Sequence, residues 1–192
     1  MTAEEIRAGK KQMRKEVKKT IMSLERSYCL QADEKIRKFL VSLPEYAAAK
    51  TVFCFVGDET EINTSPFLEQ ILADGKTLAV PLCVGQGIME ARQIGGLNEL
   101  TSGYYGLLEP AEDSPLVKPE SIDLAVIPCV SCNHTGARLG HGGGFYDIYF
   151  SRNKINSKVM ICREKVMRED IPVEAHDLTF DCVISEEGVF RL

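Results

Sequence analysis

The sequence of this 192-residue chain lacks any apolar run long enough to span a membrane. Its first residues, 1–5, are polar and lack the apolar stretch of a signal peptide. The formal net charge of −5 argues against general nucleic-acid binding, although residues 7–26 form a locally basic stretch. These absences lead us to expect a cytoplasmic protein without membrane or nucleic-acid partners.

Linkers, internal repeats and low-complexity segments are also missing, so nothing in the sequence separates two domains. A length of 192 residues suits one domain that buries a core of its own. A hydrophobic content of 44% and a charged content of 27% are ordinary for a globular protein. We therefore predict a single domain over residues 1–192.

The sequence also shows no Ser-His-Asp or Cys-His arrangement of the kind used in nucleophilic catalysis. One Cys-x-x-Cys pair, Cys129 and Cys132, has His134 nearby and raises zinc or redox chemistry. Zinc needs a fourth ligand, yet no second Cys-x-x-Cys or His-x-x-x-His occurs. A thioredoxin-like pair opens a helix, whereas this pair is predicted in a loop. We therefore interpret the seven cysteines as free thiols of a reducing compartment.

Hydrophobic periodicity predicts helices and strands that alternate along the chain. Pro44 should end the second helix, while Ser65 as N-cap and Pro66 as first helical residue should start the third, which Gly75 stops. The predicted elements are helices over 13–24, 32–43, 65–73 and 145–154, strands over 51–56, 77–81, 88–94, 122–128, 158–162 and 180–185, and a tail over 188–192.

The order strand, helix, strand over residues 51–81 forms a β–α–β unit, which implies parallel strands. The fold class is therefore α/β, a three-layer α/β/α sandwich with a mostly parallel Rossmann-like sheet. Ligands of such sheets bind beyond the carboxyl ends of the strands, at a switch point. Glu61, Pro81 and the glycine-rich run described next all follow predicted strand ends, so we expect them to line one mouth.

The most informative run is Arg138 to Asp147, which follows a strand and a polar loop over 129–138 and opens a helix. Its glycines allow backbone N–H groups to approach an anion, and the helix start adds unpaired donors. Arg138 offers a planar fork for phosphate oxygens, and Asp147 offers a carboxylate for magnesium. The run matches neither the P-loop nor the dinucleotide fingerprint, so a glycine-rich turn without a ligand is the alternative interpretation.

With its neighbours, this run resembles the 5-formyltetrahydrofolate cyclo-ligase (methenyltetrahydrofolate synthetase) family. That family carries a strand ending in Pro and then R-L-G-x-G-x-G-[YF]-Y-D, as at Ile127-Pro128 and Arg138 to Asp147. The other stretches that agree are Lys10, Met13 and Arg14; Glu61-Ile62-Asn63-Thr64; Gly106 to Pro110; and Pro172, His176, Asp177 and Asp181. The resemblance extends from Lys10 to about Ser185.

The resemblance implies closure of a ring on a reduced folate, with ATP as co-substrate and Mg²⁺ as metal. We expect the chain to be a monomer. Product would be 5,10-methenyltetrahydrofolate, with ADP and phosphate released. One rival interpretation is a related ATP-dependent enzyme for a different formyl- or carboxyl-bearing substrate. Another is a folate- or nucleotide-binding regulator without turnover, and a third is nucleic-acid binding through the basic amino-terminal helix.

The resemblance also implies roles for individual residues, with His176-Asp177 bracing a loop. The implied catalytic residues are Arg138, Tyr146 and His141. The implied ATP-binding residues are Lys10, Arg14, Arg138, Gly140, Gly142, Gly143, Gly144 and Tyr146. The implied folate-binding residues are Glu61, Pro81, Met89, His141 and Tyr146, and the implied metal ligands are Asp147 and Asp181.

Several positions depart from the family pattern. Leu82 stands where the family often has Arg or Lys, so one expected anion contact is missing. Asn133 stands where Asp is usual, and Cys129 and Cys132 occupy a Pro-Gly-x-x-aromatic-Asp stretch. His141 and Gly143 replace basic residues of some members. These departures bear on the identity of the substrate more than on nucleotide binding.

Overall fold

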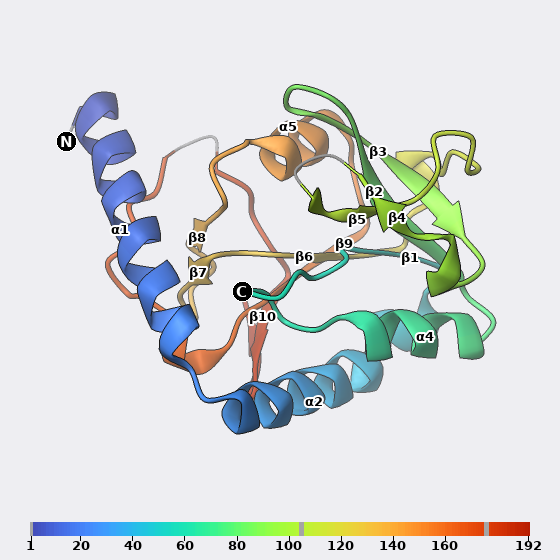
Figure 1. Cartoon of the computed structure of the whole chain (residues 1–192), viewed down its shortest axis with the longest axis horizontal. Helices are drawn as coiled ribbons and strands as arrows, with labels where there is room; N and C mark the ends of the chain where they lie inside the picture. The colour runs from blue at the N-terminus through green and yellow to red at the C-terminus, as the bar shows by residue number, and fades with distance from the viewer. Residues whose placement is uncertain (1, 104–105, 175–176) are drawn as a thin grey trace.

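The computed structural model describes residues 2–103, 106–174 and 177–192 (Figure 1). Its α-helices are α1 (Ala3–Ser23), α2 (Arg26–Ser42), α3 (Pro44–Ala48), α4 (Ser65–Ala73) and α5 (Phe145–Arg152). The strands of the large sheet are β1 (Thr51–Cys54), β2 (Thr77–Gly85), β3 (Ile88–Ile94), β6 (Leu124–Ile127), β9 (Ser157–Ile161), β10 (Cys182–Ser185) and β11 (Gly188–Arg191). Two small hairpins pair β4 (Thr101–Ser102) with β5 (Leu108–Glu109) and β7 (Ser131–Cys132) with β8 (Arg138–Leu139).

The large sheet has the strand order β11-β10-β9-β6-β1-β2-β3. Pairs from β10 to β2 are parallel, whereas β11 and β3 join the two edges as antiparallel strands. After β1 the chain extends the sheet on one side through β2 and β3, and it then returns to the other side of β1 with β6. The switch point therefore lies between β1 and β6, where α/β sheets bind ligands.

Helices cover both faces of this sheet, as Figure 1 shows. Alternation along β1 sends Phe53 to one face, where α1 and α5 pack with Met13, Val17 and Phe150. Val52 and Cys54 point to the other face, which is covered by α2, α3 and α4. The predicted three-layer sandwich with a mostly parallel sheet is confirmed.

Helix starts differ from the sequence prediction in several places. The first two helices begin at Ala3 and Arg26, ahead of the predicted residues 13 and 32. Pro44 does end α2, but it also begins the short helix α3 as its first residue, because the missing N–H costs nothing there. The N-cap of α4 is Thr64 and not Ser65. The Thr64 hydroxyl donates to the Phe55 carbonyl and accepts from the Gly57 N–H, so it ties the turn after β1 instead of capping the helix.

Two segments predicted without regular structure contain strands. Residues 188–191 form β11 and not a tail, since each of these residues pairs with β10. The predicted polar loop over 129–138 folds back on itself as the hairpin of β7 and β8, in which Cys132 pairs with Arg138. The structural consequence is that Arg138 is held by a neighbouring strand. Among the described residues no helix combines the length and apolarity needed to cross a membrane.

Candidate active site at the switch point of the sheet

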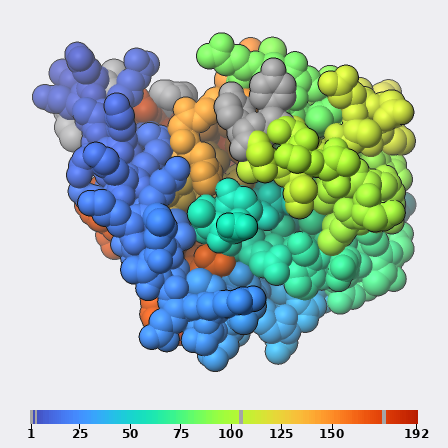
Figure 2. All heavy atoms as spheres, in the orientation of Figure 1, coloured from blue at the N-terminus to red at the C-terminus, as the bar shows by residue number. Residues whose placement is uncertain are grey.

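A cavity of about 490 Å³ opens beyond the carboxyl ends of β1 and β6. Figure 2 shows this side of the molecule, with the orange segment of the glycine run and α5 between blue α1 and the yellow-green segment of β4 and β5. Its lining comprises Lys18, Phe55, Val56, Asp58, Glu61, Pro81, Cys83, Met89, Leu107, Leu108, Glu109, Pro128, Arg138 and the run from Gly140 to Asp147. The predicted mouth is thus formed by segments far apart in sequence.

The glycines of the run have distinct reasons to lack a side chain. A Cβ on Gly140 would lie 2.9 Å from Nη1 of Arg138 and would displace the guanidinium. Gly142 and Gly144 have φ angles of 100° and 71°, which residues with a side chain rarely adopt. Gly144 is also the N-cap residue of α5. The loop therefore combines close backbone approach with a helix start, which is the arrangement that binds phosphate.

Arg138 is almost entirely buried beneath this loop, with 6% of its side chain exposed. Its Nε donates to the Pro128 carbonyl at 3.0 Å, and its Nη1 donates to Oδ1 of Asp147 at 3.0 Å. The guanidinium carbon lies 5.6 Å from the ring centre of Tyr146, within the range of a cation–π interaction. These contacts fix the cation at the wall of the cavity before any anion arrives.

Arg14 brings a second cation to the loop from α1. Its Nε donates to the Gly140 carbonyl at 2.6 Å, across 126 residues of sequence. Burial, together with the nearby charge of Arg138, lowers the pKa of Arg14, while Asp147 raises it. At the glycine loop two guanidinium groups thus lie near one carboxylate, which leaves an excess of positive charge there that an anion would neutralise.

Tyr146 is the second residue of α5 and lines the cavity. Burial raises the pKa of Tyr146 well above its ordinary value, and the carboxylate of Glu61 adds to the increase. The phenol therefore stays protonated at neutral pH and can donate a hydrogen bond. It is not suited to act as a general base.

Glu61 lines the cavity and contacts His141 of the glycine loop. The Nε2 of His141 lies 2.9 Å from Oε1 of Glu61, and 12% of the Glu61 side chain is exposed. The second carboxylate oxygen accepts the N–H of Asp58 at 3.2 Å. Pro81 and Met89 line the same cavity from the paired strands β2 and β3. The Glu61 carboxylate thus shares the cavity with the apolar side chains of Pro81 and Met89, a combination that suits a polar heterocycle with donor N–H groups.

Asp147 lies beyond the carboxyl ends of the parallel strands and Asp181 at their amino-terminal ends. The expectation that both hold one metal ion is therefore corrected. Asp147 lines the cavity, with 40% of its side chain exposed. Asp181 precedes β10 at the amino-terminal edge, where its Oδ2 accepts the N–H of Lys158 at 2.7 Å. Asp181 directly precedes a strand that runs parallel to β6, so the length of the sheet separates it from the mouth.

Lys10 sits one helical turn before Arg14 but does not line the cavity. Its ammonium contacts Oε2 of Glu174 at 3.1 Å and Oδ2 of Asp177 at 3.1 Å. Asp177 also accepts the N–H of Glu174, so it does brace this loop. His176, its predicted companion, lies outside the described residues.

Sequence reasoning did not single out Lys18, Cys83 or Glu109 as site residues, although all three line the cavity. Lys18 is four residues after Arg14, and that helical spacing was the signal available. Glu109 is buried, and its Oε1 accepts the Cys83 N–H at 2.9 Å, which ties the hairpin of β4 and β5 to β2. Glu109 lies in the stretch from Gly106 to Pro110, one of the family motifs noted above.

The departures from the family pattern have simple structural settings. Leu82 is buried and does not line the cavity, whereas its neighbours Pro81 and Cys83 do. Asn133 accepts three hydrogen bonds at Oδ1, from the N–H and hydroxyl of Thr135 and from the N–H of Ala137. A carboxylate could accept the same bonds, so the change to Asn removes a charge without removing the turn.

The likeness of this chain to known proteins extends over most of its length. Residues 6–186 match the model of the 5-formyltetrahydrofolate cyclo-ligase family. A Schizosaccharomyces pombe protein named "Probable 5-formyltetrahydrofolate cyclo-ligase" is 30% identical over 172 residues, covering 81% of this chain and 84% of that protein. The Escherichia coli K12 5-formyltetrahydrofolate cyclo-ligase is 28% identical over 157 residues, covering 79% and 86%.

Solved structures agree with this likeness. The NMR structure of Aquifex aeolicus 5,10-methenyltetrahydrofolate synthetase has a TM-score of 0.83 and 28% identity, over 95% of this chain and 92% of that chain. A Mycoplasma pneumoniae 5,10-methenyltetrahydrofolate synthetase, at 21% identity and a TM-score of 0.75, has the same fold. With the match over residues 6–186, these findings show that the chain belongs to the 5-formyltetrahydrofolate cyclo-ligase family.

Proposed function

We propose that this chain converts 5-formyltetrahydrofolate to 5,10-methenyltetrahydrofolate in an ATP- and Mg²⁺-dependent reaction that releases ADP and phosphate. The observation that carries this proposal is the convergence of Arg14 and Arg138 on a glycine loop beside a cavity of about 490 Å³. A cavity of this size accommodates small-molecule substrates, and the excess positive charge favours phosphate. Membership of the cyclo-ligase family supports the choice of substrate.

In the proposed reaction the formyl oxygen attacks the γ-phosphorus of ATP, and the bond from that phosphorus to ADP breaks. Nitrogen 10 then attacks the formyl carbon and loses its proton, and phosphate leaves with the former formyl oxygen. No protein nucleophile takes part. The protein has to hold two substrates in contact and neutralise charge on the transferring phosphoryl group.

For the phosphate side we assign Arg138 and Arg14 to the oxygens of the transferring group, with the N–H groups of residues 140–144 around the other phosphates. Tyr146 would donate its hydroxyl proton as a hydrogen bond, since burial raises its pKa and keeps the phenol neutral. Lys10 is assigned to the outer phosphates only, because it does not line the cavity. To bind them it would first have to leave Glu174 and Asp177.

For the folate side we assign Glu61 to the amino and ring N–H groups of the pterin, which a carboxylate can accept in pairs. Pro81 and Met89 would cover the apolar faces of the ring. His141, held 2.9 Å from Glu61, is the proposed acceptor of the proton that nitrogen 10 loses, because an imidazole nitrogen can accept a proton.

The residues at the mouth fit a magnesium ion that arrives with the nucleotide. Asp147 is a half-exposed carboxylate beside the phosphate loop, and Mg²⁺ commonly uses one or two carboxylates, substrate phosphates and waters. Such an ion would supply charge neutralisation on the phosphates. Asp147 would orient it, and Arg138 would remain in contact with Asp147 from the buried side.

The deciding experiment mixes purified protein with 5-formyltetrahydrofolate, ATP and Mg²⁺ and follows the near-ultraviolet absorbance of the methenyl product. The expected signal requires all three components and is matched by equimolar ADP release. ATP binding without any product would transfer the search to another formyl- or carboxyl-bearing substrate. Folate and ATP both failing to bind would refute the proposed site.

A further inference from the structure

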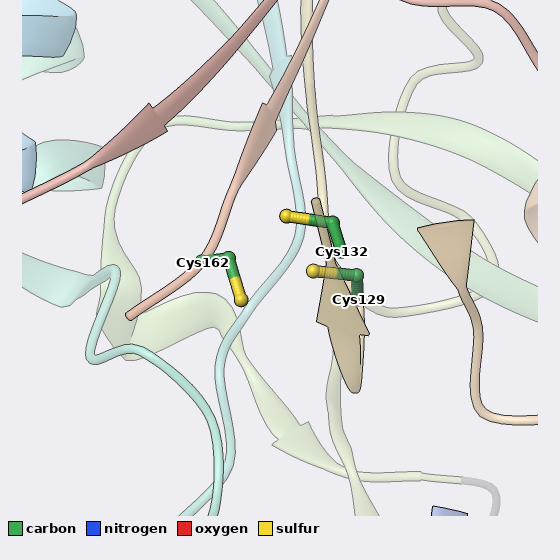
Figure 3. A group of neighbouring side chains, drawn as sticks. All are labelled: Cys129, Cys132 and Cys162. Carbon is green, nitrogen blue, oxygen red and sulfur yellow. The ribbon is translucent and has the colours of Figure 1, made fainter. Parts of the chain in front are cut away.

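Three cysteines that the proposed reaction does not use converge below the active site (Figure 3). Cys129 follows β6, Cys132 lies in β7 and Cys162 follows β9, so three separate segments contribute one thiol each. Their sulfur atoms lie within 4.8 Å of one another. The sequence shows only the pair Cys129 and Cys132, and pairing of β6 with β9 supplies the third thiol.

The geometry points to a site for one thiophilic metal ion with a filled d shell, Zn²⁺ or Cu⁺, bound by the sulfurs of Cys129, Cys132 and Cys162. A metal–sulfur bond of about 2.3 Å places ligand sulfurs roughly 3.8–4.0 Å apart, so the trio has to close by about 1 Å at most. Thiolate is the ligand type that both ions prefer. Cys129 is half-buried and the other two are buried, so an ion could enter past Cys129.

The missing fourth ligand, which argued against zinc in the sequence, is not supplied by His134. That ring contacts Glu164 at 2.9 Å through Nε2 and packs against Phe190 with ring centres 4.1 Å apart. A small cavity of about 20 Å³, lined by Cys129 and Cys162, lies beside the trio. It has room for one water, which would complete a tetrahedral Zn²⁺ site, whereas Cu⁺ needs only the three sulfurs.

Metal binding requires the thiolate form of each ligand, so it displaces any proton that a thiol carries. The Sγ of Cys129 donates to the Ile161 carbonyl at 3.4 Å, and that of Cys162 donates to the Arg163 carbonyl at 3.5 Å. Binding forms three metal–sulfur bonds, and each S–H bond that is present is broken with release of its proton, without change of oxidation state. A disulfide would join two of these sulfurs and leave the third unused.

The site is linked to the active site through Pro128. This residue lines both cavities, precedes Cys129 and accepts the hydrogen bond of Arg138. An ion held by Cys129 and Cys132 would therefore stiffen the segment that positions the catalytic guanidinium. Metal binding itself is measured without folate or ATP, so its outcome is independent of the proposed reaction.

The test uses the full chain, reduced, freed of metal with a chelator and handled without oxygen. Zn²⁺ and Cu⁺ are titrated in separate arms against a competing chromogenic chelator, with proton release followed in weak buffer. We expect one ion per chain, and the arm with the higher affinity identifies the preferred ion. Cys162→Ser should weaken binding by about 100-fold or more, since even outer-shell partners contribute 10- to 100-fold.

The matched control is Cys182→Ser. Cys182 is also buried, but it is the first residue of β10 and so lies at the other end of the strands from Cys162. This variant should bind metal like the unaltered chain, and circular dichroism shows whether each variant is folded. X-ray absorption of the metal-loaded, unaltered chain does not depend on the folding of any variant. Three sulfur ligands are expected at about 2.3 Å from the metal. Absence of stoichiometric binding, binding that survives Cys162→Ser, or a shell without three sulfurs would overturn the proposal.

Discussion

The amino-terminal and carboxyl-terminal ends of the strands in the central sheet both carry acidic residues, but these residues contact different kinds of partner. At the amino-terminal edge, Asp123 accepts the N–H groups of Lys50 and Thr51, and Asp181 accepts that of Lys158. At the carboxyl edge, Glu61 and Asp147 contact the side chains of His141 and Arg138. Backbone partners cannot leave, whereas side-chain cations can exchange a carboxylate for a ligand. Asp123 and Asp181 therefore hold strands together, whereas the side-chain contacts of Glu61 and Asp147 suit the ligand-binding roles proposed for them.

The largest expected effect comes from Arg138→Ala at the carboxyl edge. Removing a cation that contacts a transferring phosphoryl group costs about 10³-fold or more in turnover. The matched control is Arg191→Ala, since Arg191 lies in the edge strand β11 and pairs with Glu45. Steady-state rates of both variants should differ by that factor while both remain folded. Turnover of Arg138→Ala within tenfold of the unaltered chain would disprove its phosphate role.

Substituting Asp147 and Asp181 with Ala, one at a time, tests whether the two acids have different roles. Asp147→Ala should lower turnover roughly 10- to 100-fold and raise the Mg²⁺ concentration needed for half-maximal rate, because an acid that orients the ion is lost. Asp181→Ala should leave both quantities nearly unchanged, since its partner is the N–H of Lys158. Equal losses in the two variants would restore the shared metal site that the sequence suggested.

Glu61→Gln should act mainly on folate binding. The loss of a charged acceptor is expected to raise the KM for 5-formyltetrahydrofolate by about 10- to 100-fold, the equivalent of roughly 1.5–3 kcal/mol. The kcat should change only a few-fold, because Glu61 is assigned to the pterin and contacts the phosphate loop only through the side chain of His141. A fall in kcat with an unchanged KM would instead place Glu61 in the chemical step.

Asp123→Ala should show the opposite behaviour at the other edge. The variant leaves the N–H groups of Lys50 and Thr51 without their acceptor, and the free energy of unfolding should fall by about 1–3 kcal/mol. Urea unfolding measures that loss. Turnover measured well below the unfolding temperature should stay at the level of the unaltered chain, and a selective loss of turnover would argue against a purely structural role.

The smallest expected effect is that of Tyr149→Phe on α5. Within the described residues the buried Tyr149 hydroxyl has no hydrogen-bond partner, so its removal should be neutral or stabilise by up to about 1 kcal/mol. Burial raises the pKa of Tyr149 to about 12 from 10.0, so the folded chain holds this proton more tightly. The raised pKa of Tyr149 adds to the free energy of unfolding. This addition is complete below pH 10 and is lost as the pH rises towards 12. Stability of the variant should therefore decline less steeply over that interval.

Helices, strands and the phosphate loop were largely predictable from the sequence, since they depend on local patterns. The strand over Ile88–Ile94 and the helix over Ser65–Ala73 lie where periodicity predicted them. The hairpin over Ser131–Leu139 was missed because its strands are two residues long and carry little periodicity. The strand Gly188–Arg191 was missed because an edge strand is defined by its partner β10.

The sequence by itself determined the α/β class, the glycine loop with Arg138, and the motifs by which the family could be identified. Each of these is written in residues close together along the chain, where spacing and backbone preference decide the outcome. Only the tertiary structure decided that Arg14 reaches Gly140 while Lys10 meets Glu174 and Asp177, that Asp181 lies away from the mouth, and that Cys162 joins Cys129 and Cys132. The packing of α1 on the sheet decides what Arg14 and Lys10 contact. Strand order decides the other two, because parallel pairing of distant segments fixes which residues share an end of the sheet.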